Sequence, residues 1–326
     1  MKKIILTVLA LIVLLVVGAA SYVYFAMPNV GPAPDLKIAY TPERVQHGEY
    51  LARHVSLCMD CHGVRDWSRF AAPPVAGTLG RGGENFNEQM GFPGNFYSKN
   101  ITPTGLKDWT DGEIFRAITT GVNKNGKAMF PVMPYSYYGR MDREDIYDII
   151  SYLRSLKPIA YTPPAGSLSF PMNFIINTIP HKAALVTKPS PSDTLAYGAY
   201  MINASGCMEC HTPEKDHNII PEKAFSGGRE YNMPNGVLRS ANLTPDNETG
   251  IGKWISLEFV QRFKMCEHLD SSAPLPPGQV NTIMPWQMYA GMDTSDLKAI
   301  YAYLRTVKPV RNKVVHFEER LNKKPL

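Results

Sequence analysis

The chain has 326 residues, which is enough for two ordinary domains. Hydrophobic residues make up 44% of it and permit packed cores, while 27 prolines and 25 glycines indicate many turns and loops. A net charge of +5 is too small for a strongly basic nucleic-acid-binding protein, so no nucleic-acid partner is expected.

An apolar segment at the N-terminus is the first expected element. Lys2 and Lys3 precede an apolar run over residues 4–27. The apolar region of a cleaved signal has about 7–15 residues and a spanning helix needs about 20, so the run favours an uncleaved transmembrane anchor over 1–27. The lysines place its start in the cytoplasm, so a single-pass protein of the cytoplasmic membrane with its domains on the periplasmic side is expected. A signal peptide cleaved after 18–20, where small residues lie, is the alternative.

The remainder of the chain contains one ordered set of motifs twice. Each copy has, in the same order, Gly-x-Tyr, Cys-x-x-Cys-His, Asn-x-Thr-Pro, a tryptophan, Met-Pro-aromatic and Tyr-Leu-Arg. The methionine precedes the Tyr-Leu-Arg tyrosine by 19 residues in both copies, which indicates an internal duplication. The expected divisions are a linker at 28–40, a first domain at 41–160, a Pro-rich linker at 161–191, a second domain at 192–311 and a C-terminal tail at 312–326.

Both copies are predicted to be mostly helical. Apolar residues recur at helical spacing over 146–153 and over 297–304. Aspartates in N-cap and capping-box positions are expected to start these two helices; they are Asp142 with Asp145 and Asp293 with Asp296. An earlier helix is expected before each Cys-x-x-Cys-His motif. There Gly48 and Gly198 either let another helix approach closely or only mark the start of the helix.

The Cys-x-x-Cys-His motif is the attachment signature of haem c. Cysteines three residues apart on a helical turn share one face, so both sulfurs reach the vinyl groups of one porphyrin, and the next residue supplies the proximal histidine. A zinc site would need a second cysteine pair nearby, and a thioredoxin-like motif would need a βαβ context. Two covalently bound haem c groups are therefore expected. The predicted attachment residues are Cys58, Cys61 and His62 for one haem and Cys207, Cys210 and His211 for the other.

A methionine opposite the histidine would complete each iron and raise its potential. Met133 and Met284 lie in matched loops before a proline, where no structural duty is evident. Met141 and Met292 are matched as well, but each precedes an expected N-cap, where a hydrophobic staple explains it. Met129, Met141 or a histidine outside the motifs stay as alternatives. The expected iron ligands are His62 with Met133 and His211 with Met284.

Two interpretations fit the repeated Asn-x-Thr-Pro segments and the tryptophans that follow them. In one, their amide, hydroxyl and indole groups bind the haem propionates, because a buried indole N–H needs a partner. In the other, asparagine, threonine and proline form an ordinary turn and the tryptophan only covers the porphyrin. The residues are Asn100, Thr102, Trp109, Asn242, Thr244 and Trp254.

Cys266 is the fifth cysteine and has no second cysteine beside it in the sequence. A buried, inert thiol is the expected role, because free cysteines behave as small hydrophobic residues in cores. A cysteine axial ligand to one of the irons is the alternative.

The repeated order of motifs resembles the class I cytochrome c fold in each half separately. The segment Asn-Leu-Thr-Pro-Asp-Asn-Glu-Thr-Gly-Ile-Gly-Lys-Trp at 242–254, the Met-Pro-aromatic loops and Leu-Ser-Phe-Pro-Met-Asn at 168–173 resemble the multihaem cytochrome subunit of membrane-bound quinoprotein alcohol dehydrogenases and gluconate-type flavin dehydrogenases. The match covers about 41–311, and it implies that the Cys-x-x-Cys-His residues and the Met-Pro methionines bind haem. That family typically has three haem motifs and a C-terminal membrane helix, so its partners do not carry over to this chain.

The expected fold is mostly α, with an N-terminal transmembrane helix followed by two tandem class I cytochrome c domains. We expect an electron-transfer protein and not an enzyme. It would relay electrons between a redox donor and an acceptor within or near a membrane-bound respiratory or dehydrogenase complex. A dihaem cytochrome c peroxidase is the alternative, although both halves keep the Met-Pro loop that would close their irons. A haem-based sensor is a third hypothesis. It is disfavoured because nothing that resembles a signalling output domain follows the second set of motifs.

Overall fold

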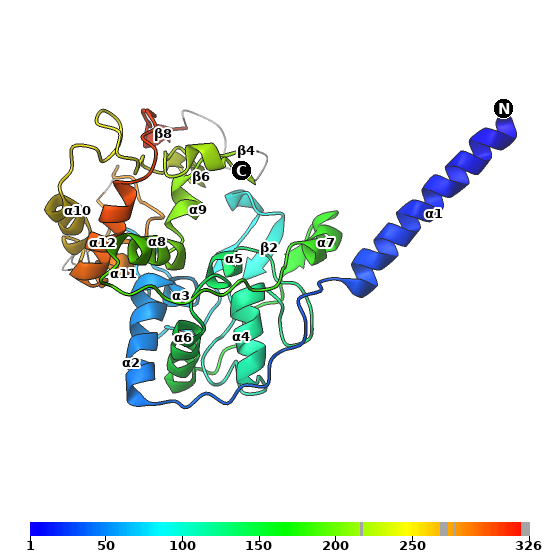
Figure 1. Ribbon diagram of the computed structural model, residues 1–326, viewed down its shortest axis with the longest axis horizontal. Helices are drawn as coiled ribbons and strands as arrows, with labels where there is room; N and C mark the ends of the chain where they lie inside the picture. Colours follow the sequence, from blue (N-terminus) through cyan, green and yellow to red (C-terminus); the bar gives the residue numbers. More distant parts are fainter. Residues whose placement is uncertain (216–217, 268–272, 277, 321–326) are drawn as a thin grey trace.

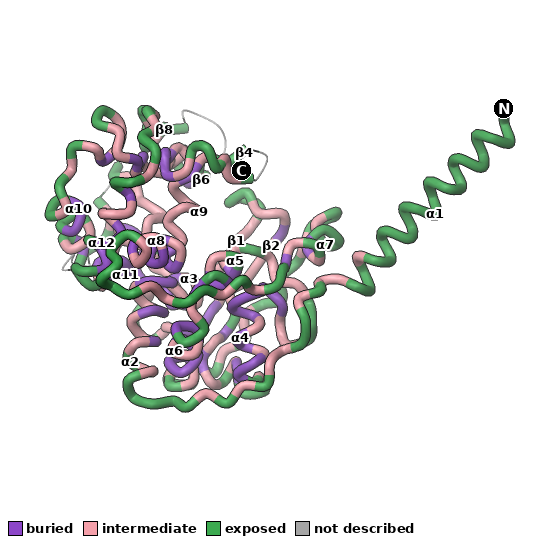
Figure 2. Tube along the Cα trace, viewed as in Figure 1, coloured by how far each residue is buried: buried purple, intermediate pink, exposed green. Residues whose placement is uncertain are grey.

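The computed structural model describes residues 1–215, 218–267, 273–276 and 278–320 and is mostly helical, as expected. Helix α1 (Lys2–Ala26) projects from the remainder of the molecule and buries none of its residues (Figures 1 and 2). Within the described residues it is the one helix long and apolar enough to cross a membrane, with a mean hydropathy of 2.9. This fits an anchor, and a signal sequence would pass the same test.

The first half begins with a helix that changes its pitch before the first cysteine. Helix α2 (Pro42–Tyr50) starts at Thr41, whose side chain accepts from the backbone N–H of Arg44, and it continues as the π-helical turn η1 (Leu51–Val55). The later elements of this half are α3 (Cys58–Cys61), β1 (Asn85–Phe86), η2 (Glu88–Met90), β2 (Gly94–Tyr97), α4 (Asp111–Thr120), α5 (Tyr135–Tyr138) and α6 (Arg143–Ser155).

The second half repeats the helical order of the first. The linker between them carries β3 (Ser167–Leu168), α7 (Met172–Ile175) and η3 (Ile176–Thr178). The second half then has α8 (Thr194–Ala204), α9 (Cys207–His211), β4 (Glu214–Lys215), β5 (Asn218–Ile219), η4 (Pro221–Lys223), β6 (Glu230–Met233), β7 (Gly236–Arg239), α10 (Ser256–Lys264), α11 (Trp286–Ala290), α12 (Thr294–Leu304) and β8 (Phe317–Glu319). Thus α8, α9, α10, α11 and α12 follow each other as α2, α3, α4, α5 and α6 do (Figure 1).

Short antiparallel sheets attach the segments that follow each half. Strand β3 of the linker pairs with β2, in the order β1-β2-β3. Strand β8 pairs with β7, in the order β6-β7-β8, so the segment expected as a C-terminal tail contributes a strand to the second half. Residues 321–326 of that segment lie outside the described residues.

The first helix of each half crosses its last helix at a glycine. A Cβ on Gly48 would lie 1.8 Å from the carbonyl oxygen of Asp148 in α6, and a Cβ on Gly198 would lie 2.1 Å from that of Ala299 in α12. Any side chain at these positions would push the helices apart. The structure therefore confirms the interpretation of these glycines as points of close approach.

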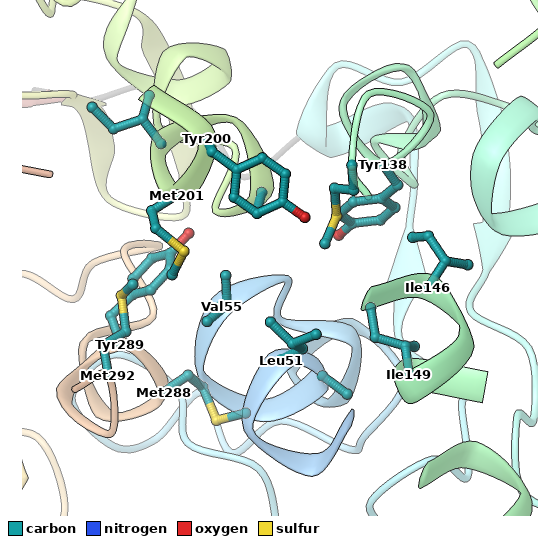
Figure 3. Close-up of a cluster of buried hydrophobic side chains, with 14 of the residues drawn as sticks. Leu51, Val55, Tyr138, Ile146, Ile149, Tyr200, Met201, Met288, Tyr289 and Met292 are labelled. Atoms are coloured by element: carbon teal, nitrogen blue, oxygen red, sulfur yellow. The ribbon is translucent and has the colours of Figure 1, made fainter. Parts of the chain in front are cut away.

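One apolar core extends through both halves. Leu51 and Val55 of η1 lie between Tyr138 and Ile146 of the first half and Met201 of the second half (Figure 3). All five side chains are at most 8% exposed. The two halves are therefore packed against each other and are not joined by the linker alone.

The expected capping boxes at α6 and α12 are wrong. Asp142 does cap α6 by accepting from the backbone N–H of Glu144 at 2.8 Å, whereas Asp293 makes no side-chain cap hydrogen bond. Asp145 and Asp296 are buried and turn away from their own helix starts. Each accepts from a tyrosine of the opposite half, since Tyr200 donates to Asp145 at 2.5 Å and Tyr50 donates to Asp296 at 2.6 Å. Contact between the halves thus takes precedence over local capping.

Candidate haem-binding sites

The two Cys-x-x-Cys-His motifs form matching helical turns. Each follows a residue in the left-handed region, Leu57 at φ 53° and Gly206 at φ 63°, which turns the chain sharply out of the preceding helix. All four motif cysteines are free thiols and partly buried. Burial raises the pKa of Cys58, Cys61 and Cys207 to about 12, so these sulfurs are protonated at neutral pH.

This environment does not fit a preformed thiolate zinc site. Zinc binds thiolates and needs further ligands close by. Among the described residues, the one cluster of acidic, histidine or cysteine side chains that could hold a metal ion is His47, Asp145 and Asp148, which contains no motif residue. Its carboxylates are already paired with Arg44 and Lys188. Thiols that are consumed in covalent attachment remain the best account of the two cysteine pairs.

Both motif histidines have the same fixed orientation. Nδ1 of His62 lies 2.6 Å from the backbone oxygen of Lys99, and Nδ1 of His211 lies 2.8 Å from that of Ala241. A carbonyl only accepts, so Nδ1 carries the proton and Nε2 keeps its lone pair for a metal. Burial lowers the pKa of both histidines, which favours the neutral form that binds iron. The donor set therefore fits a proximal haem ligand in each half.

A pair of glycines, which the sequence analysis did not find, holds the backbone of the two motif histidines in place. The backbone N–H groups of Gly82 and Gly227 each donate to the carbonyl of the motif histidine at 2.8 Å. Both glycines have positive φ, at 74° and 69°. A Cβ would lie 2.5 Å from the carbonyl carbon of Lys99 or 2.4 Å from that of Ala241. The Gly-Gly pair that recurs in both halves was the available signal.

The Met-Pro loops are tied to the cysteine motifs by a tyrosine in the short helix that follows. Tyr138 of α5 donates to the carbonyl of Ser56 at 2.6 Å, and Tyr289 of α11 donates to that of Ser205 at 2.5 Å. These carbonyls lie two residues before the first cysteine of each motif. The predicted ligands Met133 and Met284 are partly buried and pack on the same core as Cys58 and Cys207.

The alternative methionines are placed as the staple interpretation expected. Met141 and Met292 are 0% and 1% exposed, and each belongs to the core that contains the first buried hydrophobic residue of the following helix, Ile146 or Leu297. Met129 lies in the loop that follows α4, where its backbone N–H donates to the carbonyl of Gly121. The partly buried Met-Pro methionines therefore stay the better predicted ligands.

The Asn-x-Thr-Pro segments form turns whose polar groups are already bonded. Asn100 accepts from the backbone N–H and hydroxyl of Thr102 at 3.0 and 2.7 Å, and its amide donates to the carbonyls of Ile159 and Tyr161 at 2.8 Å. In the second half Asn242 accepts from the backbone N–H and hydroxyl of Thr244 in the same way, at 2.9 and 2.8 Å, and its amide donates to Thr249 and to the carbonyl of Val310. These bonds support the turn interpretation. A propionate contact from these residues stays a prediction, and it would require one of the bonds to break.

The tryptophans differ from these turn residues. Trp109 and Trp254 are partly buried on the core, and neither indole N–H has a hydrogen-bond acceptor within the described part of the chain. Their loops are held by arginines of the Tyr-Leu-Arg motif, because Arg154 donates to the carbonyl of Trp109 at 2.5 Å and Arg305 donates to that of Gly252 at 2.6 Å. A propionate contact of the two indole groups stays a prediction. The arginines were missed as site residues, although their repetition was visible.

Cys266 follows α10 and is 4% exposed. Burial raises the pKa of its thiol, which keeps it protonated. This environment is that of an unreactive core cysteine, as expected.

The chain is similar to known c-type cytochromes. It is 27% identical over 310 residues to the cytochrome c subunit of the quinone-dependent alcohol dehydrogenase of Gluconacetobacter polyoxogenes, which covers 90% of this chain and 61% of the relative. The cytochrome c subunit of gluconate 2-dehydrogenase of Pantoea cypripedii is 29% identical, over 81% of this chain and 59% of the relative. A diheme cytochrome c-type protein of Cereibacter sphaeroides is 25% identical over 92% of this chain and 97% of its own length.

These relatives limit what can be transferred. No family model matches the chain. The chain spans about three fifths of the length of the alcohol and gluconate dehydrogenase subunits, at 61% and 59%. The homologues support electron transport by a haem protein and favour it over a peroxidase.

Proposed function

We propose that the chain is a dihaem c-type cytochrome that relays electrons on the periplasmic side of the cytoplasmic membrane. Two tandem class I domains, at 41–160 and 192–311, would each carry one haem c, and α1 would hold them at the membrane. The observation that carries the proposal is the matched orientation of His62 and His211, which leaves Nε2 of each imidazole free for iron.

The residues of each half have separate roles in this proposal. Cys58 and Cys61, and their counterparts Cys207 and Cys210, form the thioether bonds. His62 and His211, together with Met133 and Met284, would bind the irons. Trp109 and Trp254 would donate to propionates, and Asn100, Thr102, Asn242 and Thr244 would hold the turns beside them. When bound, haem c supplies one-electron oxidation and reduction. The chain itself fixes the histidine tautomer, holds the methionine loops with Tyr138 and Tyr289 and covers both sites with apolar side chains.

A redox partner in a membrane-associated complex fits this role. The relatives are named as subunits of alcohol and gluconate dehydrogenases, and we propose that this chain likewise takes electrons from a dehydrogenase or respiratory complex and gives them to an acceptor. Because both halves keep a Met-Pro loop tied to the cysteine motif, we propose that both irons are closed and that the chain has no substrate of its own.

Absorption spectroscopy of the purified haem-loaded protein tests the proposal. We expect two haems per chain, low-spin spectra, the near-infrared band of methionine bound to ferric iron, and no change when carbon monoxide or peroxide is added. Met133→His and Met284→His should each remove about half of the methionine band. Met141→Leu, a volume-conserving change of a buried methionine, is the matched control and should leave the band intact.

Two outcomes would contradict the proposal. Carbon monoxide binding by the unmodified protein would show an open iron and favour the peroxidase. Loss of the methionine band in Met141→Leu, with Met133→His unchanged, would move the axial ligand of the first site to Met141.

A further inference from the structure

The linker between the halves carries an uncharged segment at residues 168–179, Leu-Ser-Phe-Pro-Met-Asn-Phe-Ile-Ile-Asn-Thr-Ile. This segment is fixed to the first half. Strand β3 pairs with β2, with Leu168 opposite Gly94, and the hydroxyl of Ser169 donates to Glu88 at 2.9 Å. The chain beyond β3 is therefore presented at a defined place on the surface.

Apolar side chains of this segment face outward. Phe170 is 83% exposed, Ile175 45% and Phe174 40%, whereas the neighbouring Ile176 is buried at 6%. We call Phe170, Phe174 and Ile175 the linker patch. An ordered group of neighbouring exposed apolar side chains indicates a contact with another apolar surface.

The linker patch lies beside the end of α1. Figure 1 shows α7 on the side of the molecule from which α1 projects, and the ring centroids of Phe174 and Tyr24 are 6.5 Å apart. A helix of 25 residues is about 37 Å long, which exceeds the hydrocarbon thickness of about 30 Å. Its last turn, with Tyr22, Tyr24 and the 81% exposed Phe25, then falls at the membrane–water interface, where aromatic residues gather. The linker patch is at the same level.

We propose that the linker patch docks on the lipid bilayer, with Phe170 and Phe174 inserted among the headgroups and the adjoining acyl chains. The patch is continuous with the anchor helix, and its segment lacks the charges that would recognise a charged protein surface. Exposed Lys182, a few residues further on, suits lipid phosphates. Two points of attachment, α1 and the linker patch, then fix the orientation of the first half on the membrane.

This inference rests on the retention of α1 as an anchor and not on the number of haems or their ligands. It is tested by site-directed spin labelling of the full-length, haem-loaded protein in vesicles of phosphatidylethanolamine and phosphatidylglycerol. In a Cys266→Ala background, nitroxide labels are placed at Phe170→Cys and Phe174→Cys. Leu257→Cys is the matched control, because Leu257 is 56% exposed on α10, on the opposite side of the molecule in Figure 1.

The measured quantity is the collision rate of each label with oxygen, which concentrates in lipid, and with a water-soluble nickel chelate. We expect labels at 170 and 174 to collide several-fold more with oxygen and several-fold less with nickel than the label at 257. Equal nickel collision rates at all three positions would overturn the proposal. Protection that is present in native membranes and absent in the vesicles would also overturn it, and would assign the patch to a protein partner.

If the protein did not float with the vesicles, α1 would not be a membrane anchor and the inference that rests on it would be overturned. The haem spectrum of the same samples reports on the electron-relay proposal separately, so the two failures are distinguishable.

Discussion

One contact between the two halves, a tyrosine that donates to an aspartate, occurs twice, once in each direction. Tyr50 of α2 donates to Asp296 in the second half, and Tyr200 of α8 donates to Asp145 in the first half. Each hydroxyl also accepts the N-cap N–H of the opposite helix, at 3.1 and 3.0 Å. The contact is therefore self-complementary, as in a two-fold symmetric dimer, although both copies belong to one chain.

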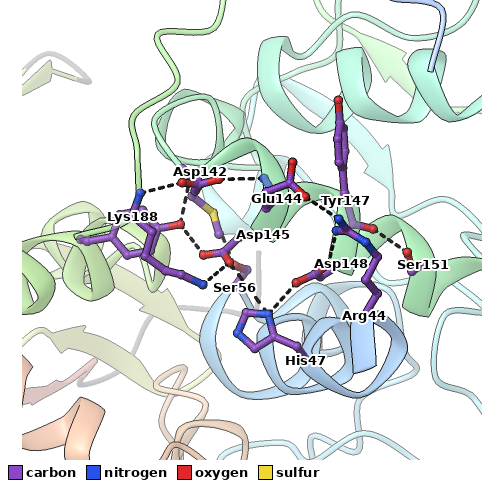
Figure 4. Close-up of polar contacts among 12 residues, drawn as sticks. Arg44, His47, Ser56, Asp142, Glu144, Asp145, Tyr147, Asp148, Ser151 and Lys188 are labelled. Carbon is purple, nitrogen blue, oxygen red and sulfur yellow. Dashed lines mark hydrogen bonds and ion pairs between the residues drawn. The ribbon is translucent and has the colours of Figure 1, made fainter. Parts of the chain in front are cut away.

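The electrostatic surroundings of the two acids have diverged. Asp145 forms an ion pair with Lys188 at 2.5 Å, and His47 lies 3.9 Å away (Figure 4). Asp296 has only hydroxyl donors among the described residues, chiefly Tyr50 at 2.6 Å and Tyr197 at 3.2 Å. The geometry of the contact is thus the same in both copies, whereas a compensating cation, Lys188 of the linker, lies beside Asp145 alone among the described residues.

The segments that lead from these tyrosines to the cysteine motifs differ in length by one residue. Tyr50 precedes Cys58 by eight residues, and Tyr200 precedes Cys207 by seven. The additional residue is taken up in the π-helical turn η1, whereas α8 has no such turn. Both the tyrosine and the cysteine motif keep their contacts, because the π turn absorbs the insertion between them.

The largest difference lies in how the loops of the predicted ligands Met133 and Met284 are held. The loop before Met133 folds on its own half, where Met129 donates to Gly121. The loop before Met284 is fixed to the first half by Asn281, which accepts from the N–H of Ala71 at 2.8 Å and donates to the carbonyls of Trp67 and Arg69 at 3.0 and 2.9 Å. The loop before Met284 is therefore held by the first half. Among the described residues no such bond joins the loop before Met133 to the second half, although Tyr137 of the following helix α5 does contact that half.

Replacement of the crossing glycines should have the largest effect and test whether the two halves share one architecture. Gly48→Ala and Gly198→Ala each force a Cβ against a backbone carbonyl, and we expect each to lower the free energy of unfolding by about 3 kcal/mol. Urea unfolding followed by haem absorption measures the loss. Gln46→Ala, an exposed change on α2, is the control. A loss at one glycine and none at the other would contradict the equivalence of the halves.

Removal of the Asn281 side chain should affect the second site alone. Asn281→Ala breaks three hydrogen bonds between the halves, and we expect a loss of about 2 to 3 kcal/mol, with weakening of the methionine band assigned to Met284. In Met133→His protein the remaining band isolates that site. Asn123→Ala, which breaks bonds within the loop of the first half, is the matched control and should spare it. Equal effects of both variants on the second site would refute the dependence.

The tyrosine pair should separate geometry from charge. Tyr50→Phe leaves Asp296 with its longer hydroxyl contacts alone, chiefly Tyr197 at 3.2 Å, so we expect a loss of about 2 kcal/mol. Tyr200→Phe leaves Asp145 paired with Lys188 and should cost about 1 kcal/mol. Urea unfolding compares the two. Combining Tyr200→Phe with Lys188→Met should then remove the advantage of the first half. An equal loss in both single variants would show that the ion pair contributes nothing.

Many features of the two halves could be predicted from the sequence because their motifs repeat. The duplicated motifs indicated the cysteine turns, the terminal helices and the spacing of Met133 and Met284. Asp145 and Asp296 were assigned to capping boxes, because local pattern does not reveal a tyrosine that reaches in from the other half. The roles of Gly82 and Arg154 were missed for a similar reason. Each donates to a backbone carbonyl that is distant in the sequence, and every residue has such a carbonyl, so no residue type in the sequence marks the partner.

His54 and Asn203 provide the smallest test, since each fixes one half to the other by donating to a backbone carbonyl. Nδ1 of His54 lies 2.8 Å from the oxygen of Met288, and the amide of Asn203 donates to Tyr137 at 2.9 Å. Burial lowers the pKa of His54, while Arg53 and Lys264 oppose its protonation and Glu49 favours it. The unfolded chain therefore binds this proton more readily than the folded protein.

It follows that the contribution of His54 to stability is fully present above the ordinary histidine pKa of about 6.5 and is lost as the pH falls below that value. His54→Asn keeps a donor to Met288 and removes the titration, so its urea midpoint should fall less between pH 7 and pH 5 than that of the unmodified protein. The difference should be smaller than the loss in Tyr200→Phe. His54→Ala removes both, and should be less stable at pH 7 while showing the same flattened pH dependence. A variant His54→Asn that keeps the full pH dependence would place the titrating group elsewhere and leave His54 as a hydrogen-bond donor that asparagine replaces, as Asn203 already does in the other half.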